Sequence, residues 1–240
     1  MPRLKTPSRE IRELGDSFRR ATETLTAHEE ELAEGLANQK RLTREVHHRV
    51  KNNLQVVSSL INLHARGATG PEVAEAYASI QRRVDALAVV HRNHYAELEE
   101  HQGVSLRALI GEIASNLRAS ANPAAGHMGI TLNIMSGTAT QDIAVPIAFL
   151  ITEIVELVMI CGPNTNIAIA LTPVPGKSNA GLLSISASSL ASHDCLNGPL
   201  AERFQRIAGG LARQLRSPLD HDLAEGRYAI EIPFITPEKI

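Results

Sequence analysis

Two adjacent histidines, His47 and His48, precede a run of cationic and amide residues in the segment TREVHHRVKNNLQVVSSL, residues 43–60. On an α-helix, which turns by about 100° per residue, one face of this segment carries polar residues at positions i, i+3, i+4 and i+7. These residues are His48, Lys51, Asn52 and Gln55. A neutral imidazole is a nucleophile near pH 7, and neighbouring cationic and amide groups stabilise the oxygens of a phosphoryl group. The face therefore indicates phosphoryl chemistry at His48, whereas the alternative is a solvated histidine with no catalytic role.

The opposite face of the same segment is mostly apolar. Residues within an arc of about 120° that includes Val46 form a predicted buried stripe. They are Val50, Asn53, Leu54, Val57, Leu60, Ile61 and His64. His47 lies about 100° from Val46, at the flank of the stripe. We therefore expect His47 to be structural and His48 to face outward, supported by Glu45 and Arg49 beside it.

The element that carries this face is a long helix. No proline occurs between residues 8 and 66, and apolar residues recur at spacings of three and four, as in a coiled coil. His28 and Gly35 interrupt this spacing, and Gly35 is a predicted weak point. RGATGP, residues 66–71, predicts a turn, and a second helical pattern runs to about residue 98. Because two helices cannot cover both apolar stripes, we expect the hairpin to dimerise into a four-helix bundle.

The second half of the chain mixes helices and strands, and the boundary between the two halves falls near residue 100. Helices are predicted at 104–121, 141–161 and 199–216, and strands at 130–135, 166–171, 182–188 and 228–234. The sequence DHD, residues 220–222, is predicted to be a solvated turn. This pattern is typical of an α/β sandwich with one sheet covered by helices. The predicted fold class is therefore α+β.

Charge and residue composition limit the classes of partner and the cellular compartment that we expect for this protein. The formal charge of −2 gives no electrostatic case for nucleic acid or for an anionic membrane. Cys161 and Cys195 lack metal-ligand spacing, and their separation favours a reducing compartment over a disulfide scaffold. His91 and His94 have no third ligand in the sequence, so we predict no metal site. With no apolar run of about 18 residues and no secretory signal, we expect a cytoplasmic location, with membrane contact only through a region N-terminal to this chain.

The segment EVHHRVKNNLQVVSSL closely resembles the phosphoacceptor box of the HisKA_2 and HWE-type sensor histidine kinases, and the likeness continues through IQRRVDALAVVHRNHY. The resemblance implies that His48 is the phosphoacceptor, because it immediately precedes RVKN. REIRELGDSFRRATETL is similar to the last helix of a HAMP signalling module. The resemblance thus implies a HAMP-like helix over 1–40, a dimerisation and phosphotransfer hairpin over 41–102 and a GHKL-type ATPase domain over 103–240.

The ATPase domain departs from the family pattern in its nucleotide-binding helix. AVPIAFLITEIVELVMIC, residues 144–161, fits the helix with the asparagine-rich motif and retains Glu153. Thr152 and Leu157 stand where the family has asparagines, and the latter position is the one expected to bind Mg²⁺. Leucine cannot ligate magnesium, which requires oxygen donors. Ile160 replaces a usual lysine.

The later nucleotide motifs are altered as well. Ala187 occupies the approximate position of the aspartate that reads the adenine amino group, so that carboxylate is missing. The glycine-rich lid is not recognisable, because Gly209 and Gly210 fall inside a predicted helix. We therefore expect a degenerate ATPase domain with no cofactor of its own.

Together these patterns predict a homodimeric protein of bacterial two-component signalling that acts on a response-regulator receiver domain. His48 would exchange a phosphoryl group with the receiver aspartate, or Asn52 would orient water for its hydrolysis, with Mg²⁺ bound to the receiver. Other histidine kinases are further candidate partners. Two alternatives stay open: a divergent but active histidine kinase, and a non-catalytic scaffold that sequesters a receiver or a partner kinase.

Overall fold

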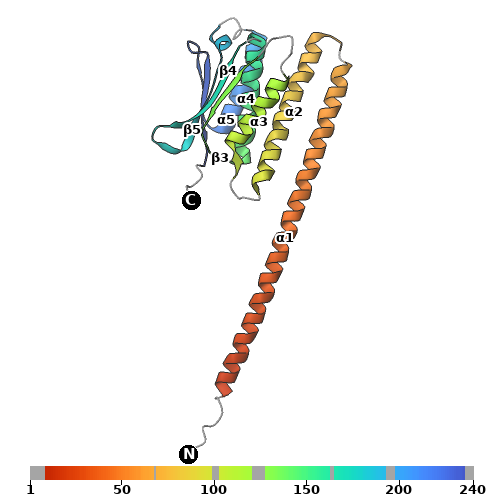
Figure 1. The fold of residues 1–240 in the computed structure, drawn as a ribbon, viewed down its shortest axis with the longest axis vertical. Helices are drawn as coiled ribbons and strands as arrows, with labels where there is room; N and C mark the ends of the chain where they lie inside the picture. The colour runs from red at the N-terminus through yellow and green to blue at the C-terminus, as the bar shows by residue number, and fades with distance from the viewer. Residues whose placement is uncertain are drawn as a thin grey trace, which may run out of the picture. The chain divides into compact units, whose positions relative to one another are not determined.

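The computed structural model describes residues 9–67, 69–98, 103–120, 128–162, 165–192 and 198–235. The chain separates into two compact units, Met1–Arg49 and Val50–Ile240, and each is described by itself. Figure 1 shows the helices and strands of both.

Helix α1 spans Arg9–Arg66, which confirms the predicted long helix. It passes through Gly35 without a break, and a Cβ atom at that position would meet no neighbouring atom within 4 Å. Much of the stripe predicted to be buried is exposed in the single chain: Val46 is 57% exposed and Leu60 is 52% exposed. In this single chain α2 covers only part of the stripe, at half-buried residues such as Leu54 and Ile61. Burial of the whole stripe in a four-helix dimer stays a prediction.

Helix α2 spans Pro71–Leu98 and completes the predicted hairpin. Side chains of α2 contact the second half of α1 at two levels. Gln81 donates a hydrogen bond from Nε2 to the hydroxyl of Ser58, and the rings of His64 and Tyr77 lie edge to face with centroids 6.4 Å apart. Another side of α2 packs against the second domain, as described below.

The α/β domain contains a five-stranded sheet in the order β2-β4-β5-β7-β6. Its strands are β2 (Ile130–Ile134), β4 (Ile167–Val174), β5 (Lys177–Ser186), β6 (Leu219–Asp222) and β7 (Arg227–Pro233). The pairing of β2 with β4 is parallel and the other pairings are antiparallel. A separate two-stranded ladder joins β1 (Val104–Ser105) to β3 (Thr138–Ala139).

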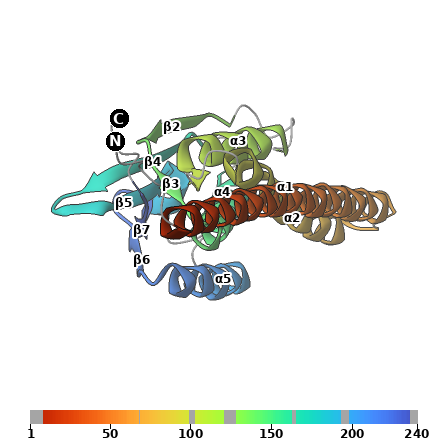
Figure 2. The same cartoon turned by 90° about the horizontal axis from the view of Figure 1, so that it is seen from below.

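Three helices cover one face of this sheet: α3 (Leu106–Ser120), α4 (Gln141–Cys161) and α5 (Pro199–Leu215), as Figure 2 shows. A short 3₁₀ helix, Ser188–Ala191, follows β5. Alternate strand residues such as Ile169 and Leu183 are fully buried, as expected for a sheet covered on one side. The predicted helices and the four predicted strands are thus confirmed to within a few residues, and so is the α+β fold class.

Helix α4 is the centre of the core. Every residue from Leu150 to Val158 is buried, including Thr152, Glu153 and Glu156. Of the described helices, α4 alone is long and apolar enough to cross a membrane, and 72% of its most apolar window is buried inside the protein.

Two local predictions are wrong. DHD is not a turn, because Asp220 to Asp222 form part of β6, where His221 stacks on Tyr228 with ring centroids 4.2 Å apart. The tertiary pairing with β7 outweighs the weak strand propensity of aspartate. Cys161 is disulfide-bonded rather than a free thiol. The wide separation of the two cysteines in the sequence therefore did not predict whether Cys161 forms a disulfide. Cys195 lies outside the described residues.

Candidate functional site

The predicted phosphoacceptor lies on the exposed surface of α1. His48 is exposed and His47 is half-buried, as the helical pattern predicted. Lys51, Asn52 and Gln55 are exposed as well. All of these residues belong to the uninterrupted helix α1, so the spacing i, i+3, i+4 and i+7 holds for them.

Two of the supporting residues pair with each other. Arg49 donates two hydrogen bonds to Oε1 of Glu45, from Nη2 at 2.8 Å and from Nε at 3.1 Å. This contact is the main cause that lowers the pKa of Glu45, and His48 adds a smaller electrostatic contribution. The guanidinium of Arg49 would therefore have to leave Glu45 before it could bind a phosphoryl oxygen.

Asn52 and Gln55 border an open depression on the surface of α1. Val56, Leu60 and Leu63 line the rest of it together with Ser59. Amide groups thus lie beside exposed aliphatic side chains, a mixture typical of a protein contact surface. This surface can offer both polar groups for chemistry and an apolar patch for docking.

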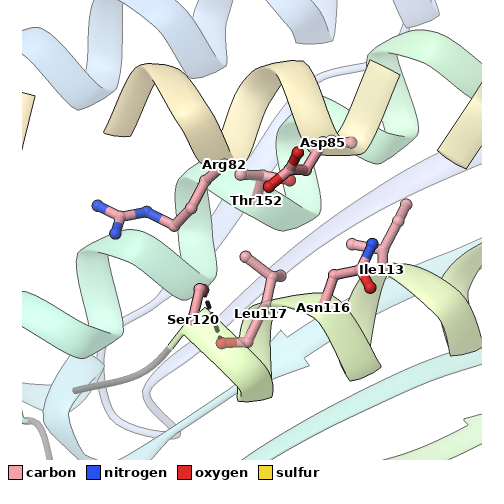
Figure 3. A pocket seen from close by; sticks show the side chains of 8 residues that line it. Arg82, Asp85, Ile113, Asn116, Leu117, Ser120 and Thr152 are labelled. Atoms are coloured by element: carbon pink, nitrogen blue, oxygen red, sulfur yellow. Dashed lines mark hydrogen bonds between the residues drawn. The ribbon is translucent and has the colours of Figure 1, made fainter. Parts of the chain in front are cut away.

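The nucleotide-binding helix identified by resemblance corresponds to α4. Thr152 is fully buried and donates its hydroxyl to the carbonyl of Ala148 at 2.8 Å. It borders a cavity of about 20 Å³ where α2, α3 and α4 meet, drawn in Figure 3 with Asp85 and Asn116. The space is about that of one water molecule.

Glu153 and Glu156 project from the same helix toward α2, and both pair with arginine. Arg83 contacts Glu153 through two bonds, Nε to Oε1 and Nη2 to Oε2, the latter at 3.0 Å. Arg82 lies 3.2 Å from Oε1 of Glu156 and also 2.6 Å from Oε1 of Glu75 on its own helix. These ion pairs raise the pKa of both arginines although burial opposes the rise.

Beside these pairs lies a pocket of about 440 Å³ between α2, α4 and α5. Its walls are partly apolar, with Leu157, Ile160, Leu200 and Phe204. Its charged lining residues are Glu72, Glu75, Glu153, Glu156, Arg83 and Arg203, so acidic groups outnumber basic ones by four to two. Leu157, at the position where the resemblance expects a magnesium ligand, is 2% exposed and offers only hydrocarbon.

The remaining nucleotide positions are also apolar or helical. Ala187 follows β5, is 5% exposed, and donates its backbone N–H to the carbonyl of Gly226 at 3.0 Å. Gly209 and Gly210 lie inside α5, as predicted. Residues 193–197 of the expected lid lie outside the described residues, as does the side chain of His94. Among the described residues, no three histidine, cysteine or acidic side chains gather as a metal site.

Sequence reasoning missed the arginine pair Arg82 and Arg83 and their partner Glu156. A signal was present, because two glutamates three residues apart stand in the most apolar helix of the chain. Buried carboxylates need partners of opposite charge, and QRRVDAL supplies adjacent arginines between apolar positions. The pattern therefore pointed to a buried ion-pair cluster, although not to the helices it would join.

Comparison with known proteins shows which class of protein this chain resembles. The family model HisKA_2, described as a histidine kinase, matches residues 45–121. Over 115 residues the chain is 34% identical to the sensor histidine kinase PdtaS of Mycolicibacterium smegmatis and 35% identical to PdtaS of Mycobacterium tuberculosis. The aligned region is 47% of this chain and 22% of PdtaS, so the chain spans about a fifth of the length of these relatives.

Solved structures show the same fold. The histidine kinase domain of the Erythrobacter litoralis EL346 blue-light activated histidine kinase matches with a TM-score of 0.52 and 19% identity, over 82% of this chain and 91% of that one. A second EL346 structure matches with a TM-score of 0.53 and 16% identity, over 78% of this chain and 60% of that one.

A helical hairpin followed by a helix-covered mixed sheet is the fold of the dimerisation and ATPase domains of histidine kinases. Residues 45–121 of this chain match the HisKA_2 histidine kinase model, which confirms the predicted resemblance over that segment. Members of the family generally dimerise and act on response regulators.

Proposed function

We propose that this protein acts on a response-regulator receiver domain through His48, as a phosphatase, a phosphotransferase or both, without effective ATP-dependent autophosphorylation. One observation carries the second half of the proposal: α4 offers no group for magnesium where the family has one. Leu157 is 2% exposed and apolar at that position. Glu153, the retained acidic residue, is already bound by Arg83.

The charge of the neighbouring pocket supports the same conclusion. A nucleoside triphosphate carries several negative charges, and nucleotide sites commonly use cationic side chains, helix N-termini and magnesium to bind them. Here four carboxylates and two guanidinium groups line the pocket. Arg83 is paired with Glu153, and the adjacent Arg82 is paired with Glu75 and Glu156. The guanidinium groups of Arg82 and Arg83 are therefore already bound to carboxylates and are not available to bind a triphosphate.

Transfer and hydrolysis at the α1 surface need no nucleotide. In transfer, an imidazole nitrogen of His48 attacks the phosphorus of the receiver's aspartyl phosphate, the bond from phosphorus to the aspartate oxygen breaks, and the carboxylate leaves. In hydrolysis, water attacks the same phosphorus, the same bond breaks, and inorganic phosphate and a proton are released. The exposed amide of Asn52 would orient this water. Mg²⁺ held by the receiver would neutralise charge on the phosphoryl oxygens.

The proposed active form is a homodimer. Large apolar side chains remain exposed along both parts of α1, from 43% for Val57 to 74% for Phe18. They include Leu14, Leu25, Leu32, Leu36, Leu42, Val46, Leu60 and Leu63. Burial of such a row against a second copy would complete the four-helix bundle.

A receiver loaded with labelled aspartyl phosphate tests the proposal. Wild-type protein should remove the label from the receiver, either to His48 or to inorganic phosphate, and denaturing gels with phosphate release measurements separate the two products. His48→Ala should abolish label transfer, and Asn52→Ala should slow phosphate release. His47→Ala is the matched control, because it removes the adjacent, half-buried imidazole.

Similarity to sensor histidine kinases favours one competing function, a divergent but active histidine kinase. Incorporation of label from ATP at His48 of the isolated protein would establish that function and refute the proposed loss of autophosphorylation. A non-catalytic scaffold is indicated instead if both His48→Ala and Asn52→Ala bind the receiver and leave its dephosphorylation and transfer rates unchanged.

A further inference from the structure

We infer that the α/β domain serves as a fixed brace for the hairpin, and that Arg82 and Arg83 are positioning residues that lock α2 onto α4. The α2–α4 brace is defined as Arg82, Arg83, Glu153 and Glu156. The effect of the brace on activity rests on the proposed function, whereas its effect on the placement of helices does not.

The first support is the shared core. Ala86, Val89 and Val90 of α2 are 4%, 0% and 1% exposed, and they belong to the same hydrophobic core as α3 and α4. Arg92 and Asn93 extend this contact, because both bind Glu112 of α3. Thus α2, although part of the hairpin in sequence, is built into the α/β domain.

The second support is the burial and direction of the ion pairs. Side-chain exposure is 8% for Arg82 and 6% for Glu153. Partly buried pairs with two hydrogen bonds hold their groups in one geometry, unlike exposed pairs, which are screened by solvent. Arg203 of α5 adds a bond from Nη2 to the hydroxyl of Ser79 on α2 at 3.3 Å. Three helices of the α/β domain, α3, α4 and α5, therefore bind α2 through polar contacts.

The third support is that the same stretch of α2 binds α1. Gln81 directly precedes the arginines, and its Nε2 bonds both Ser58 of α1 and Oδ1 of Asp85, the latter at 2.8 Å. Residues 81–85 thus connect α4 to α1 within little more than one helical turn. Ser58 follows Asn52 by six residues, which is about 9 Å along the helix axis.

A continuous path therefore runs from α4 through the brace to the α1 surface that carries Asn52. Water orientation at a phosphoryl group is sensitive to displacements of about 1 Å, which can change a rate about 100-fold. An α2 released from α4 would let this part of α1 shift relative to the α/β domain. The degenerate ATPase domain would then keep a role as a support for the chemistry on α1.

The test uses the full chain with three variants: Arg83→Glu, which places like charges at the brace, the milder Arg83→Gln, and the charge swap R83E/E153R. Arg213→Glu, an exposed residue of α5, is the matched control. Hydrogen exchange of amides 53–62 in α1 and receiver dephosphorylation kinetics are measured for each.

Arg83→Glu should speed exchange of these α1 amides by about tenfold and lower kcat by about tenfold or more, with KM changed less than about twofold. The swap should restore both quantities in large part, and Arg213→Glu should change neither. If Arg83→Glu does not fold, Arg83→Gln should show the same two effects in weaker form.

Unchanged exchange and unchanged kcat in a folded Arg83 variant would overturn the brace, and so would a loss of kcat that the swap leaves uncorrected. If the wild-type protein neither dephosphorylates nor accepts phosphate from the receiver, the proposed function is refuted. The exchange measurement then still decides whether the brace exists.

Discussion

Replacement of Arg82 by alanine should be among the most destabilising single changes at the surface between α2 and α4. The Arg82 side chain is 8% exposed and Glu156 is 10% exposed, and the two lie 3.2 Å apart. Removal of one partner from a buried pair costs about 3–5 kcal/mol, because the other charge stays buried without compensation. The Glu156 carboxylate would not be compensated through its other oxygen, since Oε2 already has no hydrogen-bond partner among the described residues.

The two partners should not be equivalent. Glu156→Gln leaves Arg82 paired with Glu75 at 2.6 Å, so it should cost about 1–2 kcal/mol. The double variant R82M/E156L should lie within about 1 kcal/mol of wild type, because apolar side chains of similar volume often replace a buried pair without loss. Arg92→Ala, which breaks a pair that is 43% and 36% exposed, is the control and should cost less than about 1 kcal/mol.

Urea unfolding at neutral pH measures these differences as shifts of the midpoint at constant slope. A cost below about 1 kcal/mol for Arg82→Ala would refute the reasoning from burial. So would a double variant as unstable as Arg82→Ala, because the loss would then come from packing rather than from an unpaired charge.

Three further predictions concern the core and its titrating groups. Ile151→Ala in α4, at a fully buried position, should cost about 2–5 kcal/mol in urea unfolding, and a smaller cost would mean that the core collapses around the cavity. Burial is the main cause that raises the pKa of Asp85, so the stability it contributes is complete below its unfolded pKa and is lost as pH rises through the folded pKa. The stability of Asp85→Asn relative to wild type should accordingly increase from pH 4 to pH 7, and a pH-independent difference would contradict this. Burial raises the pKa of Tyr228 to about 12, so stability should fall between about pH 10 and 12, and one tyrosine should ionise late in an ultraviolet absorbance titration.

The local sequence determined the elements and the outward face of α1. Apolar spacing of three and four residues, together with the lack of proline, was sufficient for α1 and α2, and the helical period placed His48 outside and His47 at the flank. Leu157 and Ala187, at positions where the resemblance expects a magnesium ligand and an aspartate, are visible in the sequence itself, because leucine and alanine have no side-chain oxygen. The DHD strand was missed because aspartate has a weak strand propensity, although its partner β7 begins only five residues later. The disulfide at Cys161 was missed as well.

Only the tertiary structure shows that α2 packs into the core of the α/β domain as well as against α1. In the sequence α2 is the second half of a hairpin, but its Val89 and Val90 are buried in the core of the α/β domain and its arginines pair with α4. Periodicity specifies that a helix has an apolar stripe but not which neighbour covers it, because that choice depends on contacts between residues such as Arg83 and Glu153, 70 positions apart. The sequence by itself therefore predicted phosphoryl chemistry at His48 and the lack of a magnesium ligand at Leu157, whereas only the packing of α2 between α1 and α4 showed how the hairpin is joined to the α/β domain.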